Sequence, residues 1–157
     1  MPTRTLRLDG EEAVSQGYPP RNENAQKLGD RVVFSDDITS FEFEPNSPSP
    51  VSGTIPPPAV RAQHSGFCIR VRGKGENFWL CQAGFLLPGL PNTAYPNGGQ
   101  IQARGLMDFS GPLPLQAAID GGFGDYDSAG GRIDITFPPT PPGAKPRSRW
   151  TMTIRTS

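Results

Sequence analysis

A glycine-rich corner between two alternating apolar segments is the strongest constraint on how this chain folds. It lies within Leu115–Phe137, LQAAIDGGFGDYDSAGGRIDITF, where the runs Leu115–Ile119 and Ile133–Phe137 flank it. Alternation of apolar and polar residues predicts strands with one buried face. The glycines between Gly121 and Gly131 permit backbone conformations that a side chain would penalise. The segment therefore predicts two strands joined by a tight, structured corner.

The same alternation recurs along the rest of the chain. Period-two segments bounded by turn-forming residues predict eight strands and little helix. Between the first two strands, the polar segment Asp9–Gly29 predicts a loop. We expect a single all-β domain over residues 1–157, with a proline-rich insert at residues 45–60. The expected strands are Thr3–Leu8, Arg31–Phe43, Phe67–Arg72, Phe78–Leu87, Gly99–Asp108, Leu113–Ile119, Arg132–Phe137 and Arg149–Arg155.

The proline-rich insert carries six prolines. Proline has no N–H to donate to a ladder and favours extended polyproline conformations. A stiff loop explains this composition without a partner-binding motif, although a motif stays open as the alternative.

Charge and composition exclude several functions. Lys and Arg number 15, as do Asp and Glu, so no excess of positive charge favours nucleic acid or an acidic membrane surface. No apolar run has the length of a membrane span, and the N-terminus lacks the apolar core of a signal peptide. We therefore expect a cytoplasmic protein that binds neither nucleic acid nor membrane.

The segment Phe67–Gln82 predicts a hairpin with a defined register. A four-residue loop, GKGE, at its tip places Cys68 opposite Cys81 and Arg70 opposite Trp79. These four residues share one face. Opposed cysteines are close enough for a disulfide, but two reduced, buried thiols are expected in the cytoplasm. The other face carries Phe67, Ile69, Val71, Phe78 and Leu80.

No recognisable catalytic or metal-binding motif stands out. His64, the chain's one histidine, falls in a predicted loop without an assigned partner, so we expect it to be exposed. This histidine, two distant cysteines and the pair Asp36–Asp37 do not make a metal-ligand set. The GGFG segment lacks the lysine and the helix of a nucleotide-binding loop. We expect neither a metal nor a cofactor.

Four segments together resemble the allene oxide cyclase and dirigent-type β-barrel group, and the terminal RWTMTIR resembles its closing strand. The resemblance implies an eight-stranded antiparallel β-barrel, in agreement with the eight expected strands. Such a lumen is filled by side chains or holds one small ligand. The glycine-rich corner then lies at the barrel rim, with Phe123 or Tyr126 at most bordering the entrance. The four segments are LGDRVVFSDDI (Leu28–Ile38), SGFCIRV (Ser65–Val71), GGQIQARGLMDF (Gly98–Phe109) and AIDGGFGDYDSAGGRIDI (Ala118–Ile135).

The resemblance also implies site residues. Phe34 matches a cavity phenylalanine of the plant cyclases, and Cys68 matches their cavity cysteine. Asp36 stands where they carry an asparagine that holds a water near the substrate. A buried carboxylate needs a partner, and Arg70 is the candidate if both side chains point inward. We therefore expect Asp36 and Arg70 to be catalytic.

The hairpin register extends this set. If Cys68 faces the lumen, Arg70, Trp79 and Cys81 face it too, and these residues with Phe34 are expected to bind substrate, Arg70 by holding an acidic or enolate oxygen. The alternative is that this face points outward. The inward arrangement leaves the opposite apolar face to be covered by loops or another subunit, which favours a homo-oligomer, a dimer or a trimer.

Members of the group close an epoxide to a cyclopentenone, fold a polyene for a pericyclic cyclisation, or orient phenoxy radicals, all without a cofactor. Glu11 and Glu12 are out of register with the first-strand glutamate of the plant cyclases, so allene oxide cyclase activity itself is not expected. We expect a cyclase or isomerase that folds a hydrophobic, polyketide- or polyene-like intermediate in natural-product biosynthesis. The alternatives are a non-catalytic dirigent-type or small-molecule-binding barrel, and a structural barrel that has lost its ligand.

Overall fold

The part of the chain that the structure describes contains nine strands and no helix. The computed structural model describes residues 3–20, 27–44, 51–55, 62–72, 76–112 and 114–156 of the 157-residue chain. Within these residues no helix is long and apolar enough to cross a membrane. The strands are β1 (Thr3–Tyr18), β2 (Arg31–Glu44), β3 (Val51–Thr54), β4 (Gln63–Arg70), β5 (Phe78–Leu87), β6 (Gly99–Asp108), β7 (Leu115–Gly124), β8 (Gly130–Thr136) and β9 (Arg147–Arg155).

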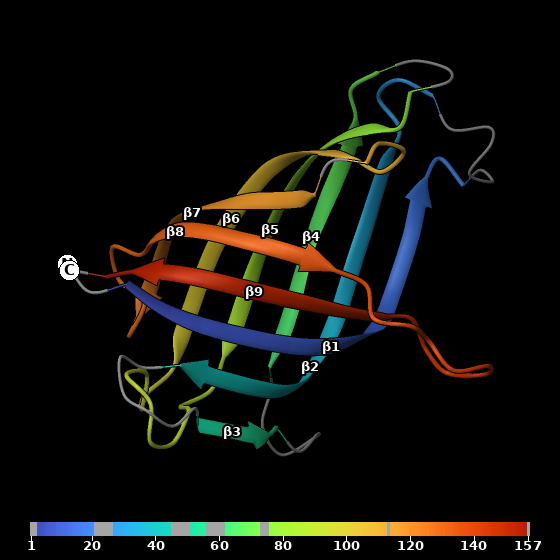
Figure 1. The fold of residues 1–157 in the computed structure, drawn as a ribbon. Helices are drawn as coiled ribbons and strands as arrows, with labels where there is room; N and C mark the ends of the chain where they lie inside the picture. The colour runs from blue at the N-terminus through green and yellow to red at the C-terminus, as the bar shows by residue number, and fades with distance from the viewer. Residues whose placement is uncertain are drawn as a thin grey trace.

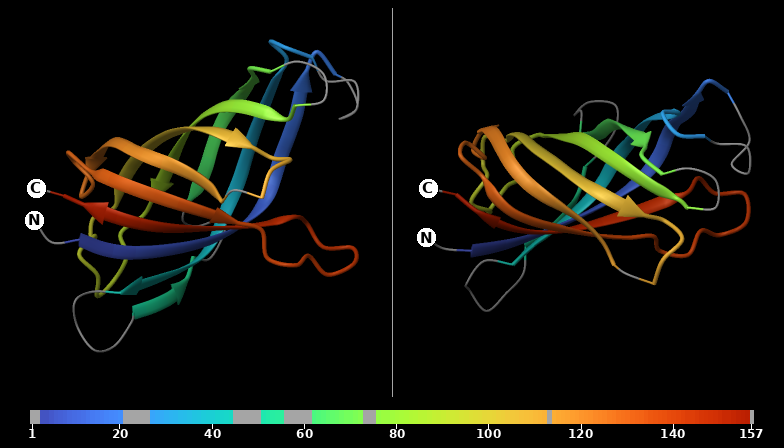
Figure 2. Two further views of the ribbon diagram at one scale, coloured as in Figure 1. Left: turned by 45° about the horizontal axis from the view of Figure 1, so that its top comes forward. Right: turned by 90° about the horizontal axis from the view of Figure 1, so that it is seen from above.

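Eight of these strands close into an antiparallel barrel (Figure 1). The order around the barrel is β1-β9-β8-β7-β6-β5-β4-β2, and β2 pairs back with β1. Both chain ends lie at one end of the barrel, where Thr3 of β1 pairs with Arg155 of β9 (Figure 2). The expected fold, an eight-stranded antiparallel β-barrel, is therefore confirmed.

The ninth strand, β3, lies inside the segment that proline content marked as a stiff loop. Val51–Thr54 contains no proline, so its backbone can pair with Ser40–Phe43 of β2. The loop prediction is wrong for these four residues, and residues 45–50 and 56–60 of the insert lie outside the described part.

β1 and β7 are among the strands that are longer than their sequence pattern indicates. β1 continues through Tyr18 instead of giving way to a loop at Asp9, and it pairs with β2 along this extension. Two register shifts, at Asp9/Gly10 and Glu12/Val14, break its alternation. β7 continues to Gly124, because its glycines let the backbone run close to β6; a Cβ at Gly122 would meet the Gln100 carbonyl oxygen at 2.6 Å.

Large side chains fill the barrel at the end where β1 begins and β9 ends. Tyr126, from the glycine-rich corner, is fully buried there, while Phe123 is 61% exposed. The corner therefore closes the filled end, and the expectation that it borders an entrance is wrong. The filling side chains are Leu6, Leu8, Phe41, Phe43, Leu87, Tyr95, Ile101, Ile119, Tyr126, Met152 and Ile154.

Two of these filling side chains are the buried tyrosines Tyr95 and Tyr126, which together form what we call the tyrosine plug. They make the free energy of unfolding sensitive to alkaline pH. The Tyr95 and Tyr126 rings stack with centroids 4.5 Å apart, and the Tyr126 hydroxyl has no hydrogen-bond partner among the described residues. Burial raises the pKa of both phenols. The unfolded chain loses these protons near the ordinary tyrosine pKa of about 10 while the fold retains them, so we expect the free energy of unfolding to fall as the pH rises above about 10.

Chemical denaturation on either side of that pH measures the effect. Tyr126→Phe removes one of the two phenols and leaves no hydrogen bond broken, so it is expected to be neutral or stabilising at neutral pH and to reduce the alkaline loss. An alkaline loss of equal size in the wild type and in this variant would contradict the assignment.

Candidate functional site

A cavity of about 1120 Å³ occupies the end of the barrel opposite the tyrosine plug. Phe109 and Phe137 line it and are 45% and 59% exposed, so they mark its mouth. Apolar side chains from β5 to β9 form much of the wall. All six residues expected at the site line this cavity, namely Phe34, Asp36, Cys68, Arg70, Trp79 and Cys81.

The hairpin of β4 and β5 has the expected register and presents the expected face. Cys68 pairs with Cys81 and Arg70 with Trp79, and these four residues are between 4% and 8% exposed. Leu80, on the opposite face, is 50% exposed. Strand residues alternate between faces, so once one of these four side chains points inward, the other three point inward as well.

Cys68 and Cys81 are joined by a disulfide across the two strands, with their Cα atoms 4.1 Å apart. The expectation of two free thiols is therefore wrong. It rested on a cytoplasmic location, and a disulfide of this kind persists mainly in oxidising compartments. The cytoplasmic location therefore stays a prediction, and the disulfide does not support it.

Arg70 lies near the mouth and is not the partner of Asp36. Its guanidinium donates to the backbone carbonyl oxygens of Arg72 at 3.1 Å and Glu76 at 2.8 Å, and lies 5.8 Å from the centroid of the Trp79 ring. Arg70 is six positions along β4 from the residue that pairs with Asp36, a separation of about 20 Å at the rise of a strand. The expected pairing of Arg70 with Asp36 is therefore wrong.

The partner of Asp36 is His64. The two residues lie opposite each other on β2 and β4, and His64 Nδ1 is 2.8 Å from Asp36 Oδ2. Each side chain is 12% exposed, and both line the cavity. His64 is thus a largely buried strand residue, and its expected place in an exposed loop is wrong because β4 begins at Gln63.

Aromatic rings surround the His64 imidazole. Its centroid is 5.0 Å from that of Phe34, 4.4 Å from Phe85 and 4.7 Å from Trp150. Gly10 makes room for Trp150, because a Cβ at Gly10 would meet the indole at 2.8 Å. Rings from three other strands thus hold the imidazole at the floor of the cavity, next to the carboxylate.

Glu12 also lines the cavity, although the polar segment that contains it predicts a loop. The extension of β1 sets Glu12 opposite Asp36, on the strand next to it in the barrel wall. No group of three or more His, Cys, Asp or Glu side chains suited to a metal ion is found within the described ranges. The cavity thus holds a histidine–carboxylate pair with a second carboxylate on the adjacent strand.

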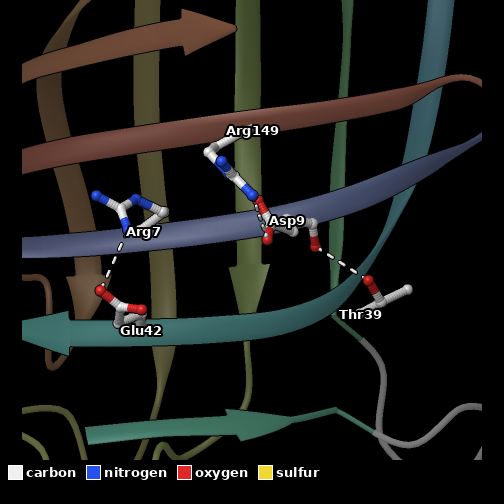
Figure 3. Close-up of polar contacts among 5 residues, drawn as sticks. All are labelled: Arg7, Asp9, Thr39, Glu42 and Arg149. Carbon is white, nitrogen blue, oxygen red and sulfur yellow. Dashed lines mark hydrogen bonds and ion pairs between the residues drawn. The ribbon is translucent and has the colours of Figure 1, made fainter. Parts of the chain in front are cut away.

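Ion pairs on the outer wall tie together the strands that carry the floor. Arg149 donates to Asp9 at 2.7 and 3.3 Å, and Arg7 donates to Glu42 at 3.1 Å (Figure 3). The hydrogen bond to Asp9, followed by its charge, raises the pKa of Arg149. Asp9 is followed in the chain by Gly10, and Arg149 is followed by Trp150. The outward ion pair therefore helps to hold β1 and β9 in place where Gly10 and Trp150 face the floor of the cavity.

Fold and cavity together define an antiparallel eight-stranded barrel with an open lumen at one end, the fold that the resemblance to the allene oxide cyclase and dirigent group implies. Solved structures confirm the resemblance at the level of the fold. Pyocyanin demethylase is similar at 17% identity and a TM-score of 0.59, over 98% of this chain and 100% of that chain.

Two dirigent proteins have the same fold. The pterocarpan synthase dirigent proteins GePTS1 and PsPTS1 are similar at 16% and 14% identity, with TM-scores of 0.63 and 0.65. Each covers 98% of this chain, which in turn covers 84% of GePTS1 and 94% of PsPTS1. No protein-family model matches the sequence, and no curated protein does.

Proposed function

We propose that this protein is a cofactor-independent isomerase or cyclase that moves a proton on an apolar small molecule held inside the barrel. The observation that carries the proposal is the Asp36–His64 pair at the floor of a largely apolar cavity of about 1120 Å³. A cavity of this size takes a drug-sized molecule and buries most of its surface.

His64 is the proposed general base. An ionised carboxylate only accepts hydrogen bonds, so Nδ1 of His64 donates to Asp36 and Nε2 is left to take a proton from the substrate. Asp36 and the surrounding ring faces then stabilise the imidazolium that forms. Glu12, on the neighbouring strand, is the proposed second group through which a proton returns to another atom of the substrate.

The apolar wall supplies containment. Phe34, Trp79 and the disulfide lie along the path from floor to mouth and restrict the conformers of a long, flexible substrate. Holding reacting atoms together converts a conformational search into an intramolecular step. A polyketide- or polyene-like chain that loses a proton at the floor and closes a ring is the proposed substrate. A pericyclic closure of such a chain transfers no proton, so it would use the containment alone.

A non-catalytic barrel that steers a reaction begun elsewhere is the second candidate. It is favoured by the apolar lining and by the fold shared with proteins named as dirigent. It predicts binding without turnover. The open cavity argues against the third alternative, a barrel with only a structural role.

A reaction that needs only a base in an apolar cavity separates the first two candidates. In nitrobenzisoxazole, a base removes the ring C–H proton, the electrons form a nitrile, the N–O bond breaks and a coloured cyano-nitrophenolate leaves. Purified protein is expected to accelerate this opening with saturation in substrate. Binding is followed separately, because both tryptophans of the chain line the cavity and report a bound molecule by fluorescence. Binding without acceleration would favour the steering barrel.

We also propose that the protein is a homo-oligomer, a dimer or a trimer. Leu80 and Leu106 pair across β5 and β6 on the outer wall and are 50% and 59% exposed, with Phe67 nearby at 41%. Such a contiguous apolar patch marks an interaction surface. The double change Leu80→Ser and Leu106→Ser is expected to yield monomers by light scattering, whereas Gln116→Ser, on the outer wall of β7, is expected to leave the mass unchanged. A wild type that is already monomeric contradicts this proposal.

A further inference from the structure

We propose that the Cys68–Cys81 disulfide is a thiol–disulfide exchange site that faces the cavity, accepts small-molecule thiols through the mouth and is shielded by a bound ligand. This inference does not depend on the proposed proton transfer. It rests on where the bond lies in the barrel.

The bond is reached from inside the barrel. Both cysteines are 8% exposed, and both line the cavity. The residue before each cysteine, Phe67 on β4 and Leu80 on β5, points to the outer surface, as strand alternation requires. A reagent in the cavity therefore meets the sulfur atoms, whereas a protein reductant at the outer wall meets other side chains.

Closure of the barrel does not depend on this bond. β4 and β5 already pair over the whole length of β4, from Gln63 opposite Leu86 to Arg70 opposite Trp79. The disulfide joins two residues that this ladder already sets opposite each other. Its cleavage thus leaves the strand pairing in place and adds two thiols to the cavity wall.

The entering thiol supplies the electrons and protons that reduction of the disulfide requires. A thiolate RS⁻ attacks one sulfur of the pair, which forms a mixed disulfide and releases the other cysteine as a thiolate. A second thiolate RS⁻ then attacks the mixed disulfide and RS–SR leaves. The two released cysteine thiolates take up the two protons that the two RS–H molecules lost, so both cysteines end as thiols. Two electrons pass from two RS–H molecules to the disulfide. A dithiol such as dithiothreitol supplies both steps and closes into its own cyclic disulfide.

The test uses the oxidised protein in its folded state. It is treated with dithiothreitol, quenched and alkylated with iodoacetamide, and the added mass is followed in time. The chain has two cysteines, so every alkylated thiol reports on this bond. Anilinonaphthalene sulfonate, whose binding is read from tryptophan fluorescence, serves as the cavity ligand. At ten times its Kd, mass action leaves about one cavity in eleven open, and reduction is expected to slow about tenfold.

A matched pair of variants tests the route. Trp79 lies on the cavity face of β5 two positions from Cys81, on the mouth side, and Leu80 lies between them on the outer face. Trp79→Ala is expected to speed reduction by dithiothreitol several-fold. Gln82→Ala, an exposed position next to Cys81 on the outer face of β5, is expected to leave the rate unchanged. Thioredoxin, which has to dock on a disulfide, is expected to reduce the wild type far more slowly than dithiothreitol does.

Three results would overturn the inference. They are a reduction rate that saturating ligand leaves unchanged, thioredoxin acting as fast as the small dithiol, and reduction that occurs only after denaturant is added. If Trp79→Ala fails to fold, the ligand and thioredoxin comparisons still decide the matter. Nitrobenzisoxazole opening is not part of this test, so failure of the proton-transfer proposal and failure of this one are read from different measurements.

Discussion

Replacing His64 with glutamine is expected to slow the opening of nitrobenzisoxazole by a factor of about 100 or more, the usual contribution of a positioned general base. Glutamine keeps hydrogen-bonding atoms beside Asp36 but cannot take a proton at neutral pH. The aromatic rings around position 64 still pack on the replaced side chain. The loss is expected in kcat, with ligand binding measured by tryptophan fluorescence nearly unchanged.

Replacing Asp36 with asparagine is expected to have a smaller effect on the same reaction. The hydrogen bond to Nδ1 remains possible, but the negative charge that stabilises the imidazolium is lost. Charge-assisted hydrogen bonds contribute about 1.5–3 kcal/mol, so the rate is expected to fall about 10- to 100-fold. Asp37→Asn is the matched control, because Asp37 is the next residue on β2, is exposed and points away from the cavity.

The pattern across these variants decides between the two candidate functions. General-base catalysis requires His64→Gln to be the slowest, Asp36→Asn to be intermediate and Asp37→Asn to match the wild type. Equal rates in all four proteins would remove the Asp36–His64 pair from the chemistry. Any acceleration would then come from the apolar cavity alone, and the proposal that His64 is a general base would fail.

The part of the fold that sequence predicts best is the β4–β5 hairpin. A short loop fixes its register, and strict alternation then assigns Cys68, Arg70, Trp79 and Cys81 to one face. Apolar residues on the outer face, such as Leu80, make the two faces look alike in sequence. Pattern alone therefore left the inward face undecided, and closure of the barrel decides it.

The floor of the site could not be predicted in the same way, for a physical reason. Around His64 the chain reads QHSG, with small or polar residues on both faces, so no apolar alternation marks a strand. His64 nevertheless shares its parity with Cys68, four positions on, and extending the strand by four residues would have placed it inward. The surrounding rings come from strands distant in sequence, and local patterns carry no information about them.

The same reasoning applies to β1. Glu11 and Glu12 lie between two register shifts, where alternation is broken, and the residues that flank them, Gly10 and Ala13, are small. Pairing with β2, rather than intrinsic preference, keeps this segment extended. The place of Glu12 in the site can therefore be recognised only from the closed barrel.

Gly66→Ala is expected to be among the most destabilising single changes in the barrel. Gly66 lies midway between His64 and Cys68 on the cavity face of β4. A Cβ there would meet the Gln82 carbonyl oxygen, as well as Ala83 Cα at 2.7 Å and Ala83 Cβ at 2.9 Å. Two of these atoms belong to the backbone of β5 and cannot turn aside, so β4 and β5 have to separate. Overpacking of this kind costs about 1–3 kcal/mol.

Gly84→Ala separates this effect from a general loss of glycine in a strand. A Cβ at Gly84 would meet the end of the Gln102 side chain at 3.3 Å, which can move away. Thermal unfolding is expected to show a fall of about 2–4 °C per kcal/mol for Gly66→Ala and little change for Gly84→Ala. Separation of the strands at Gly66 also shifts His64 from Asp36, so the Gly66 variant is expected to lose nitrobenzisoxazole activity below its unfolding temperature. Equal stability of the two variants would show that β4 and β5 tolerate a side chain at Gly66, and that close approach of these strands is not what positions His64.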